Sequence, residues 1–379
     1  EAVTVAERIG YPVLVRPSFV LGGRAMMIVY NSEDLVGYMN DAVDVSPDRP
    51  VLVDRFLEAA VEVDVDCISD GETSVVGAIM QHIEQAGIHS GDSACVIPAF
   101  SLSEPIKTQI LKAAKDLARE LGVRGLMNIQ FAVKDEELYV IEVNPRASRT
   151  VPFVSKSIGV PLAKLAAKIM VGKTLKELGF TEEILPDHYC VKEAVFPWPR
   201  FPGIDIVLGP EMKSTGEVMG TGDTFAAAFA RAQLGAGDEP PTSGLCLISV
   251  RDVDKAAAVE VARRLVARGF TLAATGGTAK ALTDAGLTVR MVNKVAEGRP
   301  HIVDLIKNDE AAIIINTTEG RRAIMDSASI RASAEQHNVF YTTTLAAAEA
   351  VCMALEQETD ITVRRLQDLH DSIHESRVV

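Results

Sequence analysis

The chain has 379 residues, of which 47% are hydrophobic, so it is long enough for two or three domains with cores of their own. It carries 52 acidic and 38 basic residues and a net charge of −14, which argues against a nucleic-acid partner, because such proteins usually gather basic residues. No apolar run approaches the roughly 18 residues of a membrane-spanning helix and no signal peptide is recognisable, so we expect no membrane partner.

The cysteines are scattered and never form a Cys-x-x-Cys motif. They are Cys67, Cys95, Cys190, Cys246 and Cys352. This pattern predicts buried free thiols, a reducing cytoplasmic location and no zinc site. Residue 1 is Glu and stands inside an expected helix, so we expect an internal piece of a longer chain.

Strands dominate the prediction for the first part of the chain. Alternating or continuous apolar patterns predict strands at residues 12–18, 25–31, 51–57, 61–68, 74–87, 126–133 and 138–144. One amphipathic helix is expected at 105–121.

A glycine-rich loop connects the first two expected strands. Gly22 and Gly23 can bring backbone N–H groups close to an anion, and Arg16 and Arg24 flank them. This pattern predicts a phosphate cover, and the alternative is an ordinary turn.

Strands 126–133 and 138–144 are predicted to form a hairpin. Matching their apolar faces requires a three-residue loop, residues 135–137, with Tyr139 and Ile141 on the apolar face. The polar pairs that result are Gln130 with Glu142 and Asn128 with Asn144.

These paired carboxylate and amide oxygens suit Mg²⁺, which takes few protein ligands and completes its octahedron with phosphate and water. Arg146 and Arg149 follow within a few residues, and their guanidinium groups fit phosphate oxygens. The hairpin therefore predicts a metal–phosphate site. The alternative is a solvated polar face of an antiparallel sheet.

Further acids precede this hairpin. Glu62, Asp64 and Asp66 share one face of their strand, where one of them can hold ribose hydroxyls, or all three can be solvated. His89, in the glycine-broken loop that follows, is expected to be a contact residue.

From residue 151 to about 230 the pattern is more helical. Helices are expected at 161–179, stopping at Gly179, and at 223–235, capped by Asp223. The turn-rich stretch 235–244 predicts a domain boundary. After it, strands and helices alternate regularly, which predicts a doubly wound parallel sheet of about five strands.

Ligands of such sheets bind at the carboxyl ends of the strands. Hydroxyl, amide and basic side chains follow several of these expected strand ends, and one group stands at a helix N-terminus, which favours anions. They are Thr275, Thr278, Lys294, Asn316, Thr317, Arg321 and Arg322. We expect a phosphorylated ligand here. The alternative is ordinary capping and turn residues.

Five segments together resemble one family. They are residues 16–26, 61–66, 82–95, 124–133 and 141–156, and they resemble the large chain of carbamoyl-phosphate synthetase. That family's large chain has two ATP-grasp halves and ends in a regulatory domain similar to methylglyoxal synthase. Because the motifs here stand directly before the regulatory domain, the chain resembles the second half, which phosphorylates carbamate.

The resemblance implies an α/β and α+β chain: an incomplete ATP-grasp domain followed by a doubly wound, methylglyoxal-synthase-like domain. We expect the nucleotide- and metal-binding part at 1–155, its helical remainder at 156–236 and the effector domain at 237–379. Since the lobe that precedes residue 1 in the family is absent from the sequence, we expect little or no synthetase activity from this chain alone.

The resemblance also implies residue roles in the ATP-grasp part. Mg²⁺ or Mn²⁺ is implied at Gln130, Glu142 and Asn144, with Arg146, Arg149 and Asn144 in the reaction. ATP contacts are implied at Arg16, Arg55, Leu57, Glu62, Gly87, Ile88, His89, Ser90, Gln130 and Glu142. Position 55 is often His in the family and is Arg here, so among these residues the resemblance gives the least support for a contact between Arg55 and the base.

Effectors are implied as well. Lys255 joins the strand-end residues above as a site for a nucleoside monophosphate, and ornithine contacts are implied at Glu84, Asp92, Glu193, Asp326 and Thr343. Arg299 stands where the synthase has its catalytic acid, so an effector site is expected rather than a second enzyme. Implied partners are the rest of the large chain and a glutamine amidotransferase small chain. The alternatives are another ATP-grasp carboxylase and a stand-alone effector-binding module.

Overall fold

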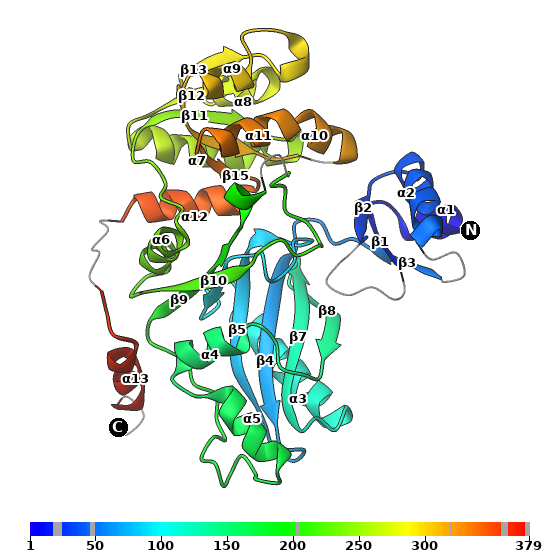
Figure 1. Ribbon diagram of the computed structural model, residues 1–379, viewed down its shortest axis with the longest axis vertical. Helices are drawn as coiled ribbons and strands as arrows, with labels where there is room; N and C mark the ends of the chain where they lie inside the picture. Colours follow the sequence, from blue (N-terminus) through cyan, green and yellow to red (C-terminus); the bar gives the residue numbers. More distant parts are fainter. Residues whose placement is uncertain (18–24, 46–49, 202–204, 319, 358–362, 376–379) are drawn as a thin grey trace.

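The structure is a computed structural model that describes residues 1–17, 25–45, 50–201, 205–318, 320–357 and 363–375. The described residues form a small lobe, a seven-stranded sheet and a parallel-sheet domain (Figure 1). No helix among them is long and apolar enough to cross a membrane. The glycine loop with Gly22, Gly23 and Arg24 lies outside the described residues.

The small lobe is an antiparallel sheet with two helices. Its strands are β1 (Val13–Pro17), β2 (Met27–Val29) and β3 (Val51–Arg55), in the order β2-β1-β3. Alternate residues of β1, Val13 and Val15, are buried against α1 (Ala2–Ile9) and α2 (Ser32–Val45). The lobe stands to one side of the rest of the molecule (Figure 1).

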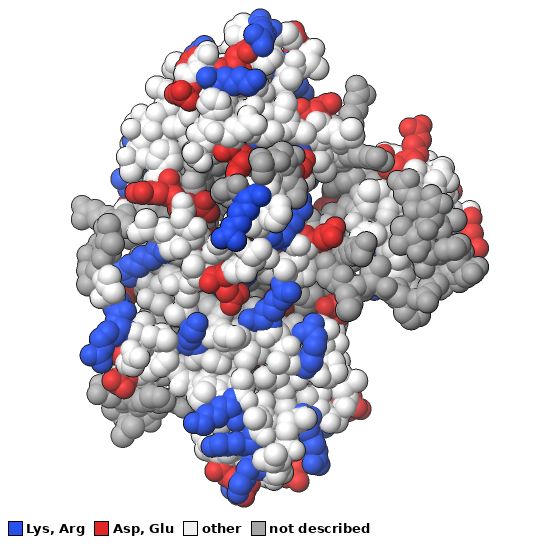
Figure 2. Space-filling view, in the orientation of Figure 1, with Lys and Arg blue, Asp and Glu red and all other residues white. Residues whose placement is uncertain are grey.

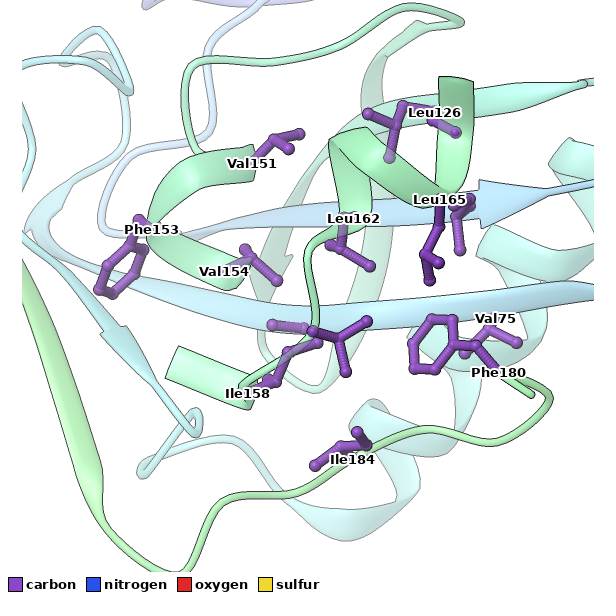
Figure 3. Close-up of a cluster of buried hydrophobic side chains, with 14 of the residues drawn as sticks. Val75, Leu126, Val151, Phe153, Val154, Ile158, Leu162, Leu165, Phe180 and Ile184 are labelled. Carbon is purple, nitrogen blue, oxygen red and sulfur yellow. The ribbon is translucent and has the colours of Figure 1, made fainter. Parts of the chain in front are cut away.

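The large sheet is antiparallel and has the order β10-β9-β6-β5-β4-β7-β8. Its strands are β4 (Val61–Ser69), β5 (Ser74–Gln85), β6 (Cys95–Ile97), β7 (Gly125–Lys134), β8 (Glu137–Asn144), β9 (Tyr189–Val195) and β10 (Gly216–Gly222). Odd-numbered β4 residues such as Val63 and Val65 pack under α3 (Glu104–Glu120). Ile68 packs on the opposite face, under α4 (Val151–Ile158) and α5 (Leu162–Met170). Figure 3 shows the side chains of these two helices pointing together over the strands.

The stretch 156–236, expected to be mainly helical, also supplies the strands β9 and β10. These strands were missed because β9 is buried on both faces and carries charged residues, Lys192 and Glu193, where an apolar run is expected. Helix α6 (Phe225–Ala236) packs closely on β9 and β10.

Two helix predictions in this stretch were partly wrong. Helix α5 ends at Met170, not at residue 179, because the chain turns at Gly172 with φ +98°, a conformation that favours glycine. Helix α6 is capped by Thr224, whose hydroxyl accepts from the Ala227 N–H, whereas Asp223 pairs with Arg364 at 3.0 Å.

The C-terminal part confirms the predicted parallel sheet. Its order is β13-β12-β11-β14-β15, from β11 (Gly244–Ser249), β12 (Phe270–Thr275), β13 (Val289–Val292), β14 (Ala311–Asn316) and β15 (Phe340–Thr342). One face is covered by α7 (Lys255–Ala267), α8 (Gly276–Asp284) and α12 (Leu345–Leu355). The other face is covered by α9 (Ile302–Lys307) and α11 (Ala328–Gln336), which α10 (Gly320–Asp326) precedes. We call this part the effector domain.

A last helix, α13 (Leu366–Glu375), returns to the large sheet and packs on α4. Ile373 is buried in the core beneath α4, and His370 Nε2 lies 2.7 Å from the Lys156 carbonyl oxygen.

Glycine is required where α6 meets β10. A Cβ atom on Gly220 would lie 2.2 Å from the Ala228 carbonyl oxygen and 2.4 Å from the Ala232 nitrogen. We expect Gly220→Ala to lower the free energy of unfolding by about 2 kcal/mol or more, because backbone atoms of the helix must move. Urea unfolding measures this. Gly216→Ala in the same strand is the control: its Cβ would have nothing nearer than the Val195 Cβ at 3.9 Å, so equal losses would contradict the packing argument.

Candidate active site

The hairpin β7–β8 carries the polar pairs predicted from the sequence, but its turn differs from the prediction. Lys134 pairs with Glu137, so the loop has two residues, Asp135 and Glu136, both with positive φ (52° and 61°), as in a type I′ turn. The predicted three-residue loop is therefore wrong.

The predicted pairs Gln130–Glu142 and Asn128–Asn144 are nevertheless present. Phe131 pairs with Val140 and Gln130 with Glu142, so Ile141 is an extra residue in β8, a β-bulge that shifts the register by one. The bulge also corrects the predicted faces: Leu138 and Val143 pack against the core, whereas Tyr139 and Ile141 are exposed.

Around these pairs the amide nitrogens are used within the protein. Asn144 Nδ2 donates to Glu142 Oε1 at 2.7 Å, and Gln130 Nε2 donates to Ser90 Oγ at 3.1 Å. Their amide oxygens, together with the exposed Glu142 carboxylate, remain for a hard cation. Beside Gln130, the buried Asp64 Oδ1 has no hydrogen-bond partner among the described residues. This donor set fits Mg²⁺ or Mn²⁺.

Asp66 links three elements next to the site through hydrogen bonds. Its buried carboxylate accepts from Asn128 Nδ2 at 3.0 Å and from the hydroxyls of Ser148 and Thr150, each at 2.7 Å. Ser148 and Thr150 belong to the loop that carries Arg146 and Arg149, so one acid fixes this loop to β4 and β7. Burial raises the pKa of Asp66 to about 6, although the three donors act to lower it.

The other acids of β4 surround a buried histidine. His82 lies 3.1 Å from Asp64 Oδ2 and 3.4 Å from Glu62 Oε2. Burial acts to lower the pKa of His82, yet the Cys95 thiol and the two acids hold that pKa well above its usual value. For Asp64, burial acts to raise the pKa, but the bond and charge of His82 bring it below its usual value. Asp64 and Asp66 are thus buried and partnered, not solvated.

Residues 87–93, which we call the closing loop, lie against the hairpin. The Gly87 N–H donates to Glu62 Oε1 at 3.1 Å, and Ser90 accepts from Gln130 as described above. The buried Lys192 Nζ donates to the carbonyl oxygens of Ser90 and Gly91, at 3.2 and 3.4 Å. The sequence analysis did not identify Lys192. The feature that could have indicated it is a basic residue within an otherwise largely apolar strand.

The predicted arginines divide between two elements. Arg146 and Arg149 are exposed beyond β8, where Arg149 contacts Met212 and Arg146 Nη1 donates to the Ala147 carbonyl at 3.0 Å. Arg16 lies on β1 of the small lobe, 3.4 Å from Asp54. Arg55 ends β3, and Leu57 follows in the connection to β4. The predicted ATP contacts thus lie on both the lobe and the large sheet.

The predicted effector residues gather at the carboxyl ends of the parallel strands. Thr275 ends β12 and Asn316 ends β14, while Lys255 Nζ lies close to Gly277 at the start of α8. Two of the residues serve the local fold, since Thr278 Oγ1 accepts from the Val250 N–H and Thr317 Oγ1 accepts from the Arg251 N–H.

Three further predicted positions of this domain are Lys294, Arg321 and Arg299. Lys294 is exposed after β13, and the Arg321 side chain lies outside the described residues. Arg299 is exposed, 3.4 Å from Asp304.

Two of the predicted ornithine residues form an acid pair: Glu193, which is buried, and Glu84, which is half-buried. Glu84 accepts from the Ala94 N–H, and Glu193 accepts from Gln233 Nε2, each at 2.7 Å. Burial and the charge of Glu84 raise the pKa of Glu193 to about 8.

The other predicted ornithine residues lie in three different elements. Asp92 accepts from the backbone of Lys213 and Ser214, Asp326 is exposed on α10, and Thr343 precedes α12.

Comparison with known proteins gives a family match for each part of the chain. Residues 1–178 match the carbamoyl-phosphate synthase L chain ATP binding domain, and residues 257–343 match the MGS-like domain. The biotin carboxylase domain of 2-oxoglutarate carboxylase from Hydrogenobacter thermophilus, solved with MgADP and bicarbonate, aligns with a TM-score of 0.50 at 19% identity, over 62% of this chain and 58% of that chain. That likeness shows a shared fold. Fold and site together define an ATP-grasp protein with an attached MGS-like domain.

Relatives give the family. The carbamoyl phosphate synthase large chains of Pseudomonas putida and Halomonas eurihalina are 62% and 60% identical over 98% of this chain. The chain therefore belongs to the carbamoyl-phosphate synthase large-chain family. It spans 34% and 35% of the length of these two relatives, about one third.

The raised pKa of Asp66 predicts a pH effect on stability. Between its usual value of 3.8 and about 6, the folded chain holds this proton more tightly than the unfolded chain does. The free energy of unfolding should therefore fall as pH rises from about 4 to about 6, by about 3 kcal/mol from this group. Urea unfolding of the native chain and of Asp66→Asn across this range measures the difference, with exposed Glu72→Gln as control. Parallel profiles for the native chain and Asp66→Asn would show that Asp66 titrates normally.

Proposed function

We propose that this chain is the part of a carbamoyl-phosphate synthase large chain that phosphorylates carbamate to carbamoyl phosphate with ATP, within carbamoyl-phosphate synthesis from bicarbonate, glutamine or ammonia, and ATP. By itself the chain should have little or no synthetase activity. The observation that carries the proposal is the set of oxygens at Gln130, Glu142 and Asn144, next to the closing loop and to the loop that carries Arg146 and Arg149. The names of the relatives agree with it. The proposal includes the rest of the large chain and a glutamine amidotransferase small chain as partners, in the cytoplasm, where free thiols such as the buried cysteines persist.

Phosphoryl transfer depends on positioning and charge neutralisation more than on covalent help. Mg²⁺ or Mn²⁺, held by Gln130, Glu142 and Asn144, would neutralise phosphate charge. Arg146 and Arg149 would bind the oxygens of the transferred group or of carbamate. The closing loop would exclude water from a labile acyl phosphate. The carbamate oxygen is already anionic, so no general base is needed.

The metal role of Glu142 predicts a metal-specific loss of binding. We expect Glu142→Gln to weaken Mg-ATP binding about tenfold or more, because a neutral amide holds the cation less well than a carboxylate does. Calorimetric titration measures this, with Glu72→Gln as the control for removing an exposed carboxylate. With EDTA present, the native and Glu142→Gln chains should bind ATP alike.

The same titrations distinguish the proposed function from the alternative, an effector-binding module. A chain that binds a nucleoside monophosphate but not Mg-ATP would be an effector-binding module and would overturn the proposed activity.

For the effector domain we propose a nucleoside monophosphate at Lys255, Thr275, Thr278, Lys294, Asn316, Thr317 and Arg321. Its phosphate would lie at the N-terminus of α8, near Lys255. We propose ornithine at Glu84, Asp92, Glu193, Asp326 and Thr343. The acid pair supports this most directly, because a bound ammonium group would offset the negative charge of Glu84, which together with burial raises the pKa of Glu193.

Ornithine binding tests the acid pair. We expect Glu193→Gln to weaken binding of ornithine about tenfold or more in calorimetry, because an amide cannot ionise to pair with an ammonium group as the Glu193 carboxyl group can. Glu217→Gln, an exposed change in the neighbouring strand β10, is the control. Absence of binding to the native chain, or equal binding by Glu193→Gln, would contradict the assignment.

A further inference from the structure

An ion pair between a buried arginine and a half-buried aspartate joins the effector domain to the ATP-grasp part. Arg331 lies on α11, its side chain is 1% exposed, and its Nε and Nη2 donate to the two carboxylate oxygens of Asp205 at 2.5 and 2.6 Å. Asp205 begins residues 205–215, which we call the linking segment, on the path from β9 to β10. A bidentate pair with a buried guanidinium is strong and directional, and the buried guanidinium is costly to leave without its partner.

On the effector side, Arg331 is bound to the elements that carry predicted ligand contacts. Its Nη2 also donates to the Ile324 carbonyl of α10 at 2.7 Å. Helix α10 begins at Gly320, directly beside Arg321. Tyr341, whose hydroxyl is also hydrogen-bonded to Arg331, donates that hydroxyl to Asn316 Oδ1 at 2.7 Å at the end of β14. A shift of α10 or of this strand end therefore reaches Arg331 through direct contacts.

On the other side, the linking segment holds the closing loop by backbone bonds. The His89 N–H donates to the Gly209 carbonyl at 2.8 Å. Asp92 accepts from the N–H groups of Lys213 and Ser214, both at 2.8 Å. Lys213 Nζ in turn donates to the carbonyl oxygens of Asp205 and Val207, at 3.1 and 2.7 Å. The segment is thus cross-braced between Asp205 and the loop.

We propose that Arg331 and Asp205 are positioning residues for the closing loop: the effector domain sets the loop's position by holding the linking segment through this pair. The inference rests on the proposed function only in taking residues 87–90 as nucleotide contacts. It assigns a residue of the effector domain, remote from the metal–phosphate site, to the geometry of nucleotide binding.

Hydrogen exchange followed by mass spectrometry tests the proposal on the full 379-residue chain. In Arg331→Gln and in Asp205→Asn, amides of residues 87–93 and 205–215 should exchange about tenfold faster or more, whereas the strands β11 and β14 should keep their native protection. Mg-ATP affinity should fall about fivefold or more in both variants. The control is Arg264→Gln, which breaks a bidentate pair with Glu356 inside the effector domain and should leave the closing loop unchanged.

The double variant Asp205→Asn/Arg331→Gln separates a pair from two independent residues. If Arg331 and Asp205 act as one unit, the double variant should bind Mg-ATP no more weakly than the single variant with the lower affinity. Native closing-loop exchange and native Mg-ATP affinity in folded Asp205→Asn would overturn the inference. General loss of protection in Arg331→Gln, with native loop exchange in Asp205→Asn, would also overturn it. If the native chain fails to bind Mg-ATP, the proposed function fails, while the exchange result still decides whether the pair positions the loop.

Discussion

The candidate site depends on a buried carboxylate whose oxygens are bonded to other parts of the protein. Asp66 lies in the middle of β4, buried, and accepts hydrogen bonds from β7 and from two hydroxyls of the loop after β8. A carboxylate in such a place is unfavourable unless its oxygens are bonded, so these donors are bound to it firmly. The loop that carries Arg146 is therefore held against the sheet by these hydrogen bonds. The proposed metal-binding oxygens and the arginines keep fixed relative positions because both are attached to this buried carboxylate.

Charge is compensated locally throughout this face of the sheet. Glu62 and Asp64 share His82, while Lys192 holds carbonyl oxygens of the closing loop and lies within the field of Glu84 and Glu193. Buried ion pairs of this kind contribute little net stability, but they fix orientation. Outside the core the charges are mixed, and Figure 2 shows Lys and Arg interspersed with Asp and Glu on the face in view.

Short-range patterns in the sequence were enough to predict much of this. Alternation along β4, β7 and β8 predicted the strands and brought Gln130 opposite Glu142. The regular strand–helix alternation predicted the parallel sheet and the cluster at its strand ends. The bulge at Ile141 was not predictable, because apolar alternation does not distinguish a three-residue loop from a two-residue loop with one extra strand residue. Lys192 and the pair Asp205–Arg331 depend on partners about 100 or more residues away, and no local pattern encodes such a distance.

The bulge has a consequence for solubility as well as for register. β8 is the last strand of its sheet, and it exposes Tyr139, Val140 and Ile141 in succession. An unpaired edge with such residues is a template on which a strand of another molecule can add. The extra residue at Ile141 interrupts the regular spacing of free N–H and C=O groups and increases the local twist, so an incoming straight strand loses register midway. The irregularity that pairs Gln130 with Glu142 thus also works against edge-to-edge aggregation of the sheet.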